Sequence, residues 1–393
     1  MQIRPLAARR HAVLVFLTVA ILSLGSSSAA AGATGWVRMA APRAHSRAAA
    51  QRTESGIRSA RKTQPSKTAG AASVGFSVNG GFQNETASDM RRDFDTMQAA
   101  GARWIRMDVN WAVIQAQGPS TYNWAPFDRV ATDSVARGLS VLAVIQYTPP
   151  WARPAGTPAE TPPTNLDDYA RFAQAAAAHF AALGVHAYEI WNEPNIAAFW
   201  RPRPDVARYT RLLTLAAAAI RAADPQAVVV TGGTSPAADD GTNIAPVTFL
   251  RGIYANGGKG SFDAVGHHPY CWPAQPGEAY AWSAWYVMYG TAPSLRSTMV
   301  ANGDGAKKIW ATEFGAPTNG PAGSFVSEDA QSRMVTNAIS LFRSYDWAGP
   351  LFWYSGRDLG TATSTRENFF GLVRYDFSQK PAYAAYKTAA TGS

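Results

Sequence analysis

The sequence is poor in several residue types, and each shortage excludes a class of site. Cysteine occurs once, as Cys271, so the chain can form no internal disulfide and no cysteine-based zinc or iron–sulfur site. Charged residues make up only 16% of the chain and hydrophobic residues 47%, which is typical of a folded protein with a large core. No G-x-G-x-x-G motif or P-loop follows the first predicted strand, so nothing supports nucleotide binding.

The net charge of +9 comes from the N-terminal region. Residues 1–73 contain eleven Lys and Arg and one acidic residue, so the remaining 320 residues carry a net charge of about −1. The folded part therefore has no basic surplus for nucleic acid, and we expect no nucleic-acid partner. The basic segment itself could contact an anionic cell envelope.

The first 33 residues resemble an export signal. Arg4, Arg9 and Arg10 precede the thirteen-residue apolar run "AVLVFLTVAILSL", and small residues follow it. This run is short for a membrane span of roughly twenty residues, so we predict a cleaved signal peptide, with an uncleaved anchor as the alternative. Residues 34–72 are rich in Ala, Arg and Ser and predict a basic disordered linker or pro-segment. The chain is thus expected to be secreted or associated with the cell envelope.

Residues 73–391 predict one domain in which short apolar strands alternate with helices. Eight strand–helix pairs can be traced, with strands at 74–78, 103–109, 140–147, 186–192, 227–233, 262–268, 308–314 and 350–355. Strands this apolar suit a parallel sheet that is buried on both faces. Eight such units favour a (β/α)8 barrel, the TIM-barrel class, over an open doubly wound sheet. We expect a monomer.

Two carboxylates stand out at the ends of predicted strands. Glu193 ends the fourth strand and Glu313 the seventh, and these strands lie nearly opposite each other across the mouth of a closed barrel. Paired carboxylates across a cleft are what cleavage of a glycosidic bond requires. One carboxyl group must be protonated to protonate the leaving oxygen, and the other must be ionised to attack the sugar or activate water.

The segments "WNEPN" (191–195) and "ATEFG" (311–315) resemble the acid/base and nucleophile signatures of retaining glycoside hydrolases of the (β/α)8-barrel clan A. Families 5 and 39 are the most similar in appearance, and the resemblance covers residues 74–390. It implies that Glu193 is the acid/base and Glu313 the nucleophile. Family 5 members usually have a histidine after the third strand, whereas this chain has Gln146 and Tyr147.

The resemblance also implies roles for residues around the two carboxylates. Asn192 matches an asparagine that binds the sugar 2-hydroxyl, and Arg106 an arginine that keeps the nucleophile ionised. His268 and Tyr270 match a His-x-Tyr pair after the sixth strand, with the tyrosine near the nucleophile. The strand-eight Trp353 matches a tryptophan that forms the floor of the binding subsite. Two aromatic residues in the loop after the third strand are further substrate-binding candidates, namely Tyr147 and Trp151.

Several neighbouring residues have a structural interpretation. Glu189 lies four residues before Glu193 and is expected to be a buried structural carboxylate, while Asp108 is expected to support the site from a loop. His267 and His268 point apart on a strand, so we predict a structural His267, no metal and no cofactor. Cys271 is expected to be an inert buried thiol. The loop at 270–290 holds seven Trp and Tyr residues and predicts a wall of the groove.

The end of the fourth strand must depart from regular geometry. On a strict strand Asn192 and Glu193 point to opposite faces, so both can contact one sugar only if the strand end is bulged or bent. Together these features predict an exported retaining hydrolase of β-glycosidic bonds. A transglycosylase and a non-catalytic carbohydrate-binding envelope protein are the alternatives. The sugar, the linkage and endo or exo action stay open.

Overall fold

The computed structural model describes residues 72–78 and 80–392, which belong to the compact unit Thr68–Ser393. The predicted signal peptide at residues 1–33 and almost all of the predicted linker at 34–72 lie outside the described residues. Both therefore remain predictions.

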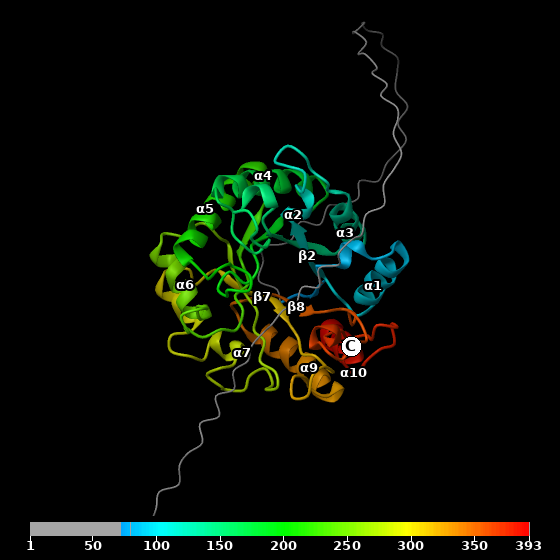
Figure 1. The fold of residues 1–393 in the computed structure, drawn as a ribbon. Coiled ribbons are helices and arrows are strands. Elements are labelled where there is room, and N and C mark those ends of the chain that lie inside the picture. The colour runs from blue at the N-terminus through cyan, green and yellow to red at the C-terminus, as the bar shows by residue number, and fades with distance from the viewer. Residues whose placement is uncertain (1–71, 79, 393) are drawn as a thin grey trace, which may run out of the picture. The chain divides into compact units, whose positions relative to one another are not determined.

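The predicted (β/α)8 barrel is confirmed. Eight parallel strands form one closed sheet in chain order, and β1 pairs with β8 to close the ring. Figure 1 shows the helices arranged around the strands. The strands are β1 (Val74–Ser77), β2 (Trp104–Asn110), β3 (Ser140–Gln146), β4 (Ala187–Ile190), β5 (Val228–Thr231), β6 (Ala264–His267), β7 (Lys308–Phe314) and β8 (Ala348–Tyr354).

A helix follows each strand, as the sequence predicts, and side-chain caps start many of them. The hydroxyl of Thr86 and the carboxylate of Asp205, for example, accept hydrogen bonds from the first turns of α1 and α5. The α-helices are α1 (Ala87–Ala99), α2 (Trp111–Ile114), α3 (Ala125–Ala136), α4 (Leu166–Ala182), α5 (Val206–Ala223), α6 (Pro246–Ala255), α7 (Ala284–Val287), α8 (Leu295–Ala301), α9 (Glu328–Ser344) and α10 (Pro381–Thr391). The 3-10 helices are η1 (Phe82–Asn84), η2 (Pro150–Ala152) and η3 (Arg366–Phe369).

The apolar core has two layers, and the inner one sets the depth of the site. A small cluster inside the barrel includes Leu142, Ala187 and Phe352, while a much larger cluster fills the space between strands and helices. Side chains two residues apart share one face of a strand. Glu189, two residues after Ala187, therefore lies one layer above the inner cluster, toward the carboxyl ends of the strands. The polar site thus rests on an apolar floor.

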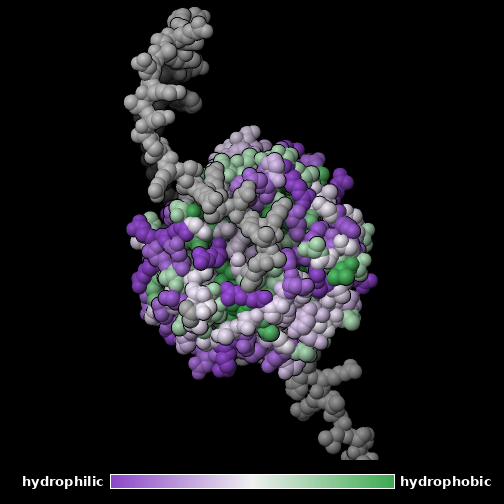
Figure 2. Space-filling view, turned by 180° about the vertical axis from the view of Figure 1, so that it is seen from behind, coloured by the Kyte–Doolittle hydropathy of each residue, from purple (hydrophilic) through white to green (hydrophobic). Residues whose placement is uncertain are grey.

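The outer surface of the barrel is mixed in character. Figure 2 shows hydrophilic side chains spread over the rear face, with hydrophobic ones scattered between them. Among the described residues, no helix has the length and apolar character needed to cross a membrane.

Gly266 of β6 provides a test of how closely the strands approach each other. A Cβ atom at this position would lie 2.3 Å from the carbonyl oxygen of Thr231 on β5, so the backbone would have to shift. We expect Gly266→Ala to lower the free energy of unfolding by about 1–3 kcal/mol in urea denaturation. In the control Gly305→Ala the nearest atom lies 3.6 Å from the new Cβ, so the free energy of unfolding of this variant should equal that of the wild type. Equal stability of both variants would contradict the close approach of β5 and β6 at Gly266.

Candidate active site

Arg106 of β2 lies at the centre of the polar layer. Its Nε and Nη2 donate to Glu189 at 2.7 and 3.3 Å, and Nη1 donates to Glu313 at 2.5 Å. Nη1 also donates to the Ser77 hydroxyl and Nη2 to Asn192 Oδ1. Burial acts against its charge, but the carboxylates of Glu189 and Glu313 raise the pKa of Arg106 above its usual value. One permanent cation therefore joins β1, β2, β4 and β7.

Glu189 is the buried structural carboxylate that the sequence predicts. Besides Arg106, it accepts hydrogen bonds from the backbone N–H of Gly233 at 2.7 Å and from the Thr312 hydroxyl at 3.2 Å. Its side chain is fully buried. Glu189 therefore orients the arginine and has no free oxygen to offer a substrate.

A bulge in β7 turns Glu313 into the barrel. Between the pairs Ala311–Leu351 and Phe314–Trp353, β7 advances three residues while β8 advances two. Thr312 and Glu313 can both face inward because of this extra residue, and Phe314 returns to the outer core. The carboxylate of Glu313 accepts hydrogen bonds from Arg106 and from the Tyr270 hydroxyl at 2.9 Å.

The electrostatic environment favours the ionised form of Glu313. Burial opposes its charge, but the charges of His268 and Arg106, with hydrogen bonds from Tyr270 and Arg106, lower the pKa of Glu313. Burial and the same carboxylate raise the pKa of Tyr270, so its hydroxyl stays protonated and remains a donor.

The predicted bend at the end of β4 is present. The strand ends at Ile190, and Trp191 and Glu193 then adopt left-handed φ angles of 70° and 45°. Such angles are uncommon for side chains with a Cβ and are typical of functional sites. The bend allows Asn192 to accept from Arg106 while Glu193 Oε1 lies 2.9 Å from His268 Nδ1.

His268 lies between the two candidate catalytic carboxylates. Its Nδ1 is 2.9 Å from Glu193 Oε1 and 3.6 Å from Glu313 Oε2. Burial opposes its protonation, but the two carboxylates outweigh burial and raise the pKa of His268. The raised pKa of His268 favours a positive charge on the ring beside Glu313.

The side-chain atoms of Glu193, His268 and Glu313 lie within 4.8 Å of one another, which is close enough to hold a metal ion. The set is poorly suited to one, however, because the cationic guanidinium of Arg106 already binds Glu313 and His268 Nδ1 is shared by the carboxylates. A divalent cation would have to displace or oppose both positive groups.

Two other candidates from the third strand lie in different surroundings. Tyr147 has a left-handed φ of 66° and is partly buried. Burial raises the pKa of Tyr147, and the charges of Asp108, Glu313 and Glu193 raise it further. Trp151 is also partly buried, donates from Nε1 to the Gln115 carbonyl, and meets Trp111 edge to face. Tyr147 is thus near both carboxylates, whereas the contacts of Trp151 are with the neighbouring loop.

The expectation that Trp353 forms the floor of the subsite is wrong. Its side chain is buried in the outer core, where it packs edge to face on Phe314 and donates to the Phe370 carbonyl. Alternation along β8 instead turns the next residue, Tyr354, toward the interior. Tyr354 is partly exposed, and the charge of Glu313 contributes to its raised pKa, after burial and Glu367. Tyr354 therefore takes the place assigned to Trp353.

The glycines after β5 matter more than the sequence suggested. A Cβ on Gly232 would lie 2.7 Å from the carbonyl oxygens of Ile190 and Trp191, and one on Gly233 would lie 2.3 Å from His268 Nε2. Both the β4 bend and the position of His268 thus require glycine at positions 232 and 233, because a Cβ atom would clash there. A pair of glycines ending a predicted strand is the signal that could have revealed this role.

The remaining candidates divide into supporting and packing residues. Burial raises the pKa of Asp108 to about 6, although Arg106 opposes the shift. His267 is buried between the Thr234 hydroxyl and the Ala284 carbonyl, as a structural histidine should be, and Cys271 is buried too. In the aromatic loop Trp285 is buried, so it packs the fold, whereas Trp282 is largely exposed.

Glu189 can be tested as the anchor of Arg106. We expect Glu189→Gln to lower the free energy of unfolding by about 3–5 kcal/mol, because a buried arginine loses its main counter-charge. Asp95→Asn is a matched control, since Asp95 also pairs with an arginine, Arg137, but its side chain is 61% exposed. That variant should lose less than about 1 kcal/mol in the same denaturation experiment. Similar losses in both variants would exclude the anchoring role.

A model of the cellulase family, glycosyl hydrolase family 5, matches residues 65–354. A search of curated proteins found no match. Solved structures with the same fold include a family 39 glycoside hydrolase from Bacteroides cellulosilyticus WH2, at 23% identity and a TM-score of 0.65. The chain covers 64% of that protein, just under two thirds of its length, and 82% of this chain is aligned.

Two further structures have similar alignments. They are a monomeric β-xylosidase from Caulobacter crescentus CB15, at 20% identity and a TM-score of 0.61, and an exo-β-1,4-mannosidase from an Opitutaceae bacterium, strain TAV5, at 17% and 0.58. Each alignment covers 82% of this chain, and 68% and 60% of the other chain respectively. At these identities the structures show a shared fold, while the family model covers most of the chain. The chain therefore belongs to the cellulase family, glycosyl hydrolase family 5.

Proposed function

We propose that the protein hydrolyses β-glycosidic bonds with retention of configuration, through a covalent glycosyl-enzyme on Glu313. The observation that carries the proposal is the close pair of carboxyl groups in unequal surroundings. Oxygen atoms of Glu193 and Glu313 lie within 4.8 Å of each other. This spacing fits direct attack by one carboxylate, since inverting enzymes separate their carboxyl groups by roughly 6.5–9.5 Å to admit a water molecule.

The contacts of each carboxylate support its proposed role. Arg106, Tyr270 and His268 keep Glu313 ionised, so it attacks the anomeric carbon as the leaving oxygen departs. Glu193 Oε1 is held by His268, which leaves Oε2 to carry the proton to the leaving oxygen. The resulting carboxylate then takes a proton from water, and that water releases the sugar from Glu313.

The surrounding residues would position the sugar. Because Asn192 Oδ1 accepts from Arg106, its amide nitrogen is left to donate to the sugar 2-hydroxyl. Tyr354 and Tyr147 supply aromatic surface near the carboxylates, and Trp151 extends it along the loop after β3. We propose a β-linked oligo- or polysaccharide as substrate, with glucan, mannan and xylan as the classes to screen. The chain would act as an exported monomer without a cofactor, and its basic N-terminal segment would contact an anionic envelope.

The assignment is tested with Glu193→Ala and Glu313→Ala on aryl β-glycosides and polysaccharides. Both variants should lose roughly 10²–10⁴-fold in kcat on polysaccharide, while the surface control Asp95→Ala, whose carboxylate is 61% exposed, keeps its activity. Azide should rescue Glu193→Ala on activated aryl glycosides and yield the β-azide. Full activity in either site variant would overturn the proposal. Product analysis with and without an acceptor sugar separates hydrolysis from transglycosylation.

The hydrogen bond from Tyr270 to Glu313 predicts a pH effect. A lowered carboxyl pKa keeps the nucleophile ionised, and the enzyme active, to lower pH than an ordinary glutamate would. Tyr270→Phe removes one donor to the ionised form, so the acid limb of the kcat/KM profile should shift upward by about half to one pH unit. Tyr383→Phe is the control, because the hydroxyl it loses donates to the Thr96 carbonyl. This variant should leave the acid limb of the kcat/KM profile unchanged. A limb unmoved in Tyr270→Phe would contradict this role.

A further inference from the structure

Glu160 is a buried carboxylate that the proposed mechanism does not use. It lies in the segment between β3 and α4 and is only 6% exposed. Its carboxylate forms no hydrogen bond and no ion pair within the described part of the chain. Neither of its oxygen atoms is fully enclosed. The carboxylate is therefore held inside the protein and is still open to a bound molecule.

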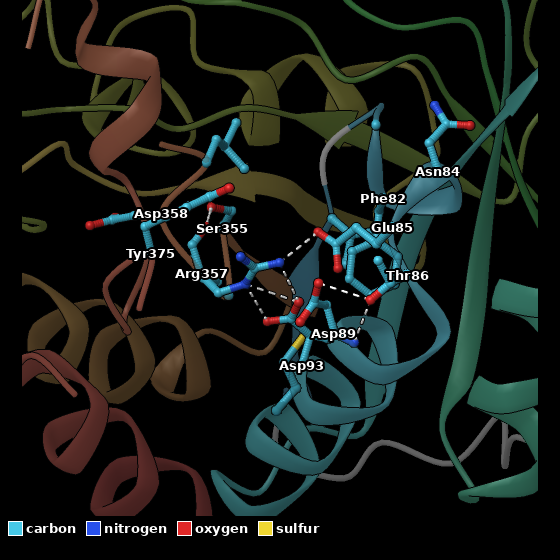
Figure 3. A pocket seen from close by; sticks show the side chains of 15 residues that line it. Phe82, Asn84, Glu85, Thr86, Asp89, Asp93, Ser355, Arg357, Asp358 and Tyr375 are labelled. Carbon is cyan, nitrogen blue, oxygen red and sulfur yellow. Dashed lines mark hydrogen bonds and ion pairs between the residues drawn. The ribbon is translucent and has the colours of Figure 1, made fainter. Parts of the chain in front are cut away.

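The other buried acids of this protein have basic partners. In a cavity of about 340 Å³ beside the carboxyl ends of β8 and β1, Arg357 is directed toward Glu85 and Asp93 and donates to both (Figure 3). Burial of an unpaired charge is costly, so a lone buried carboxylate points to a partner that arrives with the substrate. Among the described residues, every buried acid except Glu160 lies 2.7–2.9 Å from a basic nitrogen, namely Asp93, Glu189, Glu193, Asp224, Asp304 and Asp358.

Backbone hydrogen bonds place Glu160 beside the candidate active site. The N–H of Thr148 donates to the Ala159 carbonyl at 2.8 Å, so the residue before Glu160 is bonded to the residue after Tyr147. The Glu160 carbonyl accepts from the N–H of Arg201, in the segment after β4, at 3.1 Å. Glu160 thus lies between the segments that follow β3 and β4, at the carboxyl end of the barrel.

The charge of Glu160 acts on the hydroxyl of Tyr147. Burial raises the pKa of Tyr147, and the charges of Asp108 and Glu160 raise it further, ahead of those of the two catalytic candidates. The Tyr147 hydroxyl therefore stays protonated, and it makes no hydrogen bond within the described residues. A hydroxyl that is free to donate and a carboxylate that is free to accept thus lie near each other at the mouth of the barrel.

The cations in this region are bonded to other groups. Burial lowers the pKa of Arg153, and the charge of Glu160 opposes that shift. Arg153 nevertheless donates to the carbonyls of Thr157 and Thr148, and it forms no ion pair with Glu160. The two cations of the candidate active site are bonded to its other carboxylates. Glu160 therefore keeps its capacity to accept hydrogen bonds for a ligand.

We propose that Glu160 is a substrate-binding residue that accepts a hydrogen bond from a hydroxyl of the sugar bound beside Tyr147. The inference rests on the proposed function. A hydroxyl both donates and accepts, so one sugar hydroxyl can accept from Tyr147 and donate to Glu160. The pair selects a sugar with a free hydroxyl at that position. A methylated or acylated oxygen has no proton to donate, and a uronic acid would bring a further negative charge.

Glu160→Gln tests this role, because the amide keeps the shape of the carboxylate and removes its charge. On the substrate of the wild type, kcat/KM should fall roughly threefold to thirtyfold, since a hydrogen bond to a charged acceptor becomes one to a neutral acceptor. The midpoint of thermal unfolding should rise by about 1–4 °C, since an unpaired buried charge is removed. A glutamate with a purely structural role would give a lower midpoint and an unchanged kcat/KM.

Asp224→Asn is the matched control. Asp224 is 3% exposed, but it pairs with His186 at 2.8 Å. These two residues precede β5 and β4, at the amino end of the barrel and away from the candidate active site. The midpoint of thermal unfolding of this variant should fall, and its kcat/KM should equal that of the wild type.

Substrate analogues that each lack one hydroxyl identify the contact. The wild type should lose roughly tenfold to hundredfold in kcat/KM on the analogue without the hydroxyl that Glu160 binds. Glu160→Ala should lose less than about threefold on that analogue, because the contact is already absent. On the other analogues both enzymes should lose equally.

A lower midpoint or an unchanged kcat/KM in Glu160→Gln overturns the binding role and leaves the proposed function standing. Equal losses by the wild type and Glu160→Ala on every analogue do the same. A wild type that hydrolyses no glycoside overturns the proposed function, and the role of Glu160 with it.

Discussion

The buried guanidinium of Arg106 is the interaction on which the rest of the site depends. Its donors reach carboxylates on β4 and β7, an amide after β4 and a hydroxyl on β1, so the same contacts connect the strands and hold the site together. A guanidinium is permanently charged and presents its donors in a fixed plane, which a lysine could not reproduce. Arg106 bonds Glu189 and Glu313 at the same time, so its charge acts on Glu313 while Glu189 keeps it in place. The charge of Arg106 that helps to lower the pKa of Glu313 is thus part of the core.

The backbone departs from regular strand geometry where these groups meet. Left-handed residues after β4 and a bulge in β7 present side chains that an ideal strand would turn toward the helices. Such conformations cost of order 1–3 kcal/mol each and persist only where the surroundings hold them. Here the hydrogen bonds of Arg106 and His268 hold the side chains, and Gly232 and Gly233 provide the space. Regular strands form the scaffold, and the irregular strand ends present the candidate catalytic groups.

The mouth of the barrel presents different groups on its opposite sides. The acid/base candidate lies at β4, and the cavity with Arg357 lies across the ring at β8 and β1. The fold is shared with a β-xylosidase and an exo-β-1,4-mannosidase, so substrate choice depends on the side chains around the mouth and not on the barrel itself.

Sequence patterns alone determined the barrel, because eight apolar strands with helices between them are a local signal that a closed parallel sheet satisfies. They also determined Glu193 and Glu313 as a pair, since each ends a strand and the two motifs support each other. The orientation of single side chains was decided only by the tertiary structure. Side chains alternate between the two faces of a strand, so a shift of one residue in register or a single bulge moves a side chain from one face to the other. For this reason Tyr354 lies where Trp353 was expected, and Glu313 faces inward. The contact of Arg357 with Glu85 joins residues 272 positions apart, and no local pattern encodes such a pair before the ring closes.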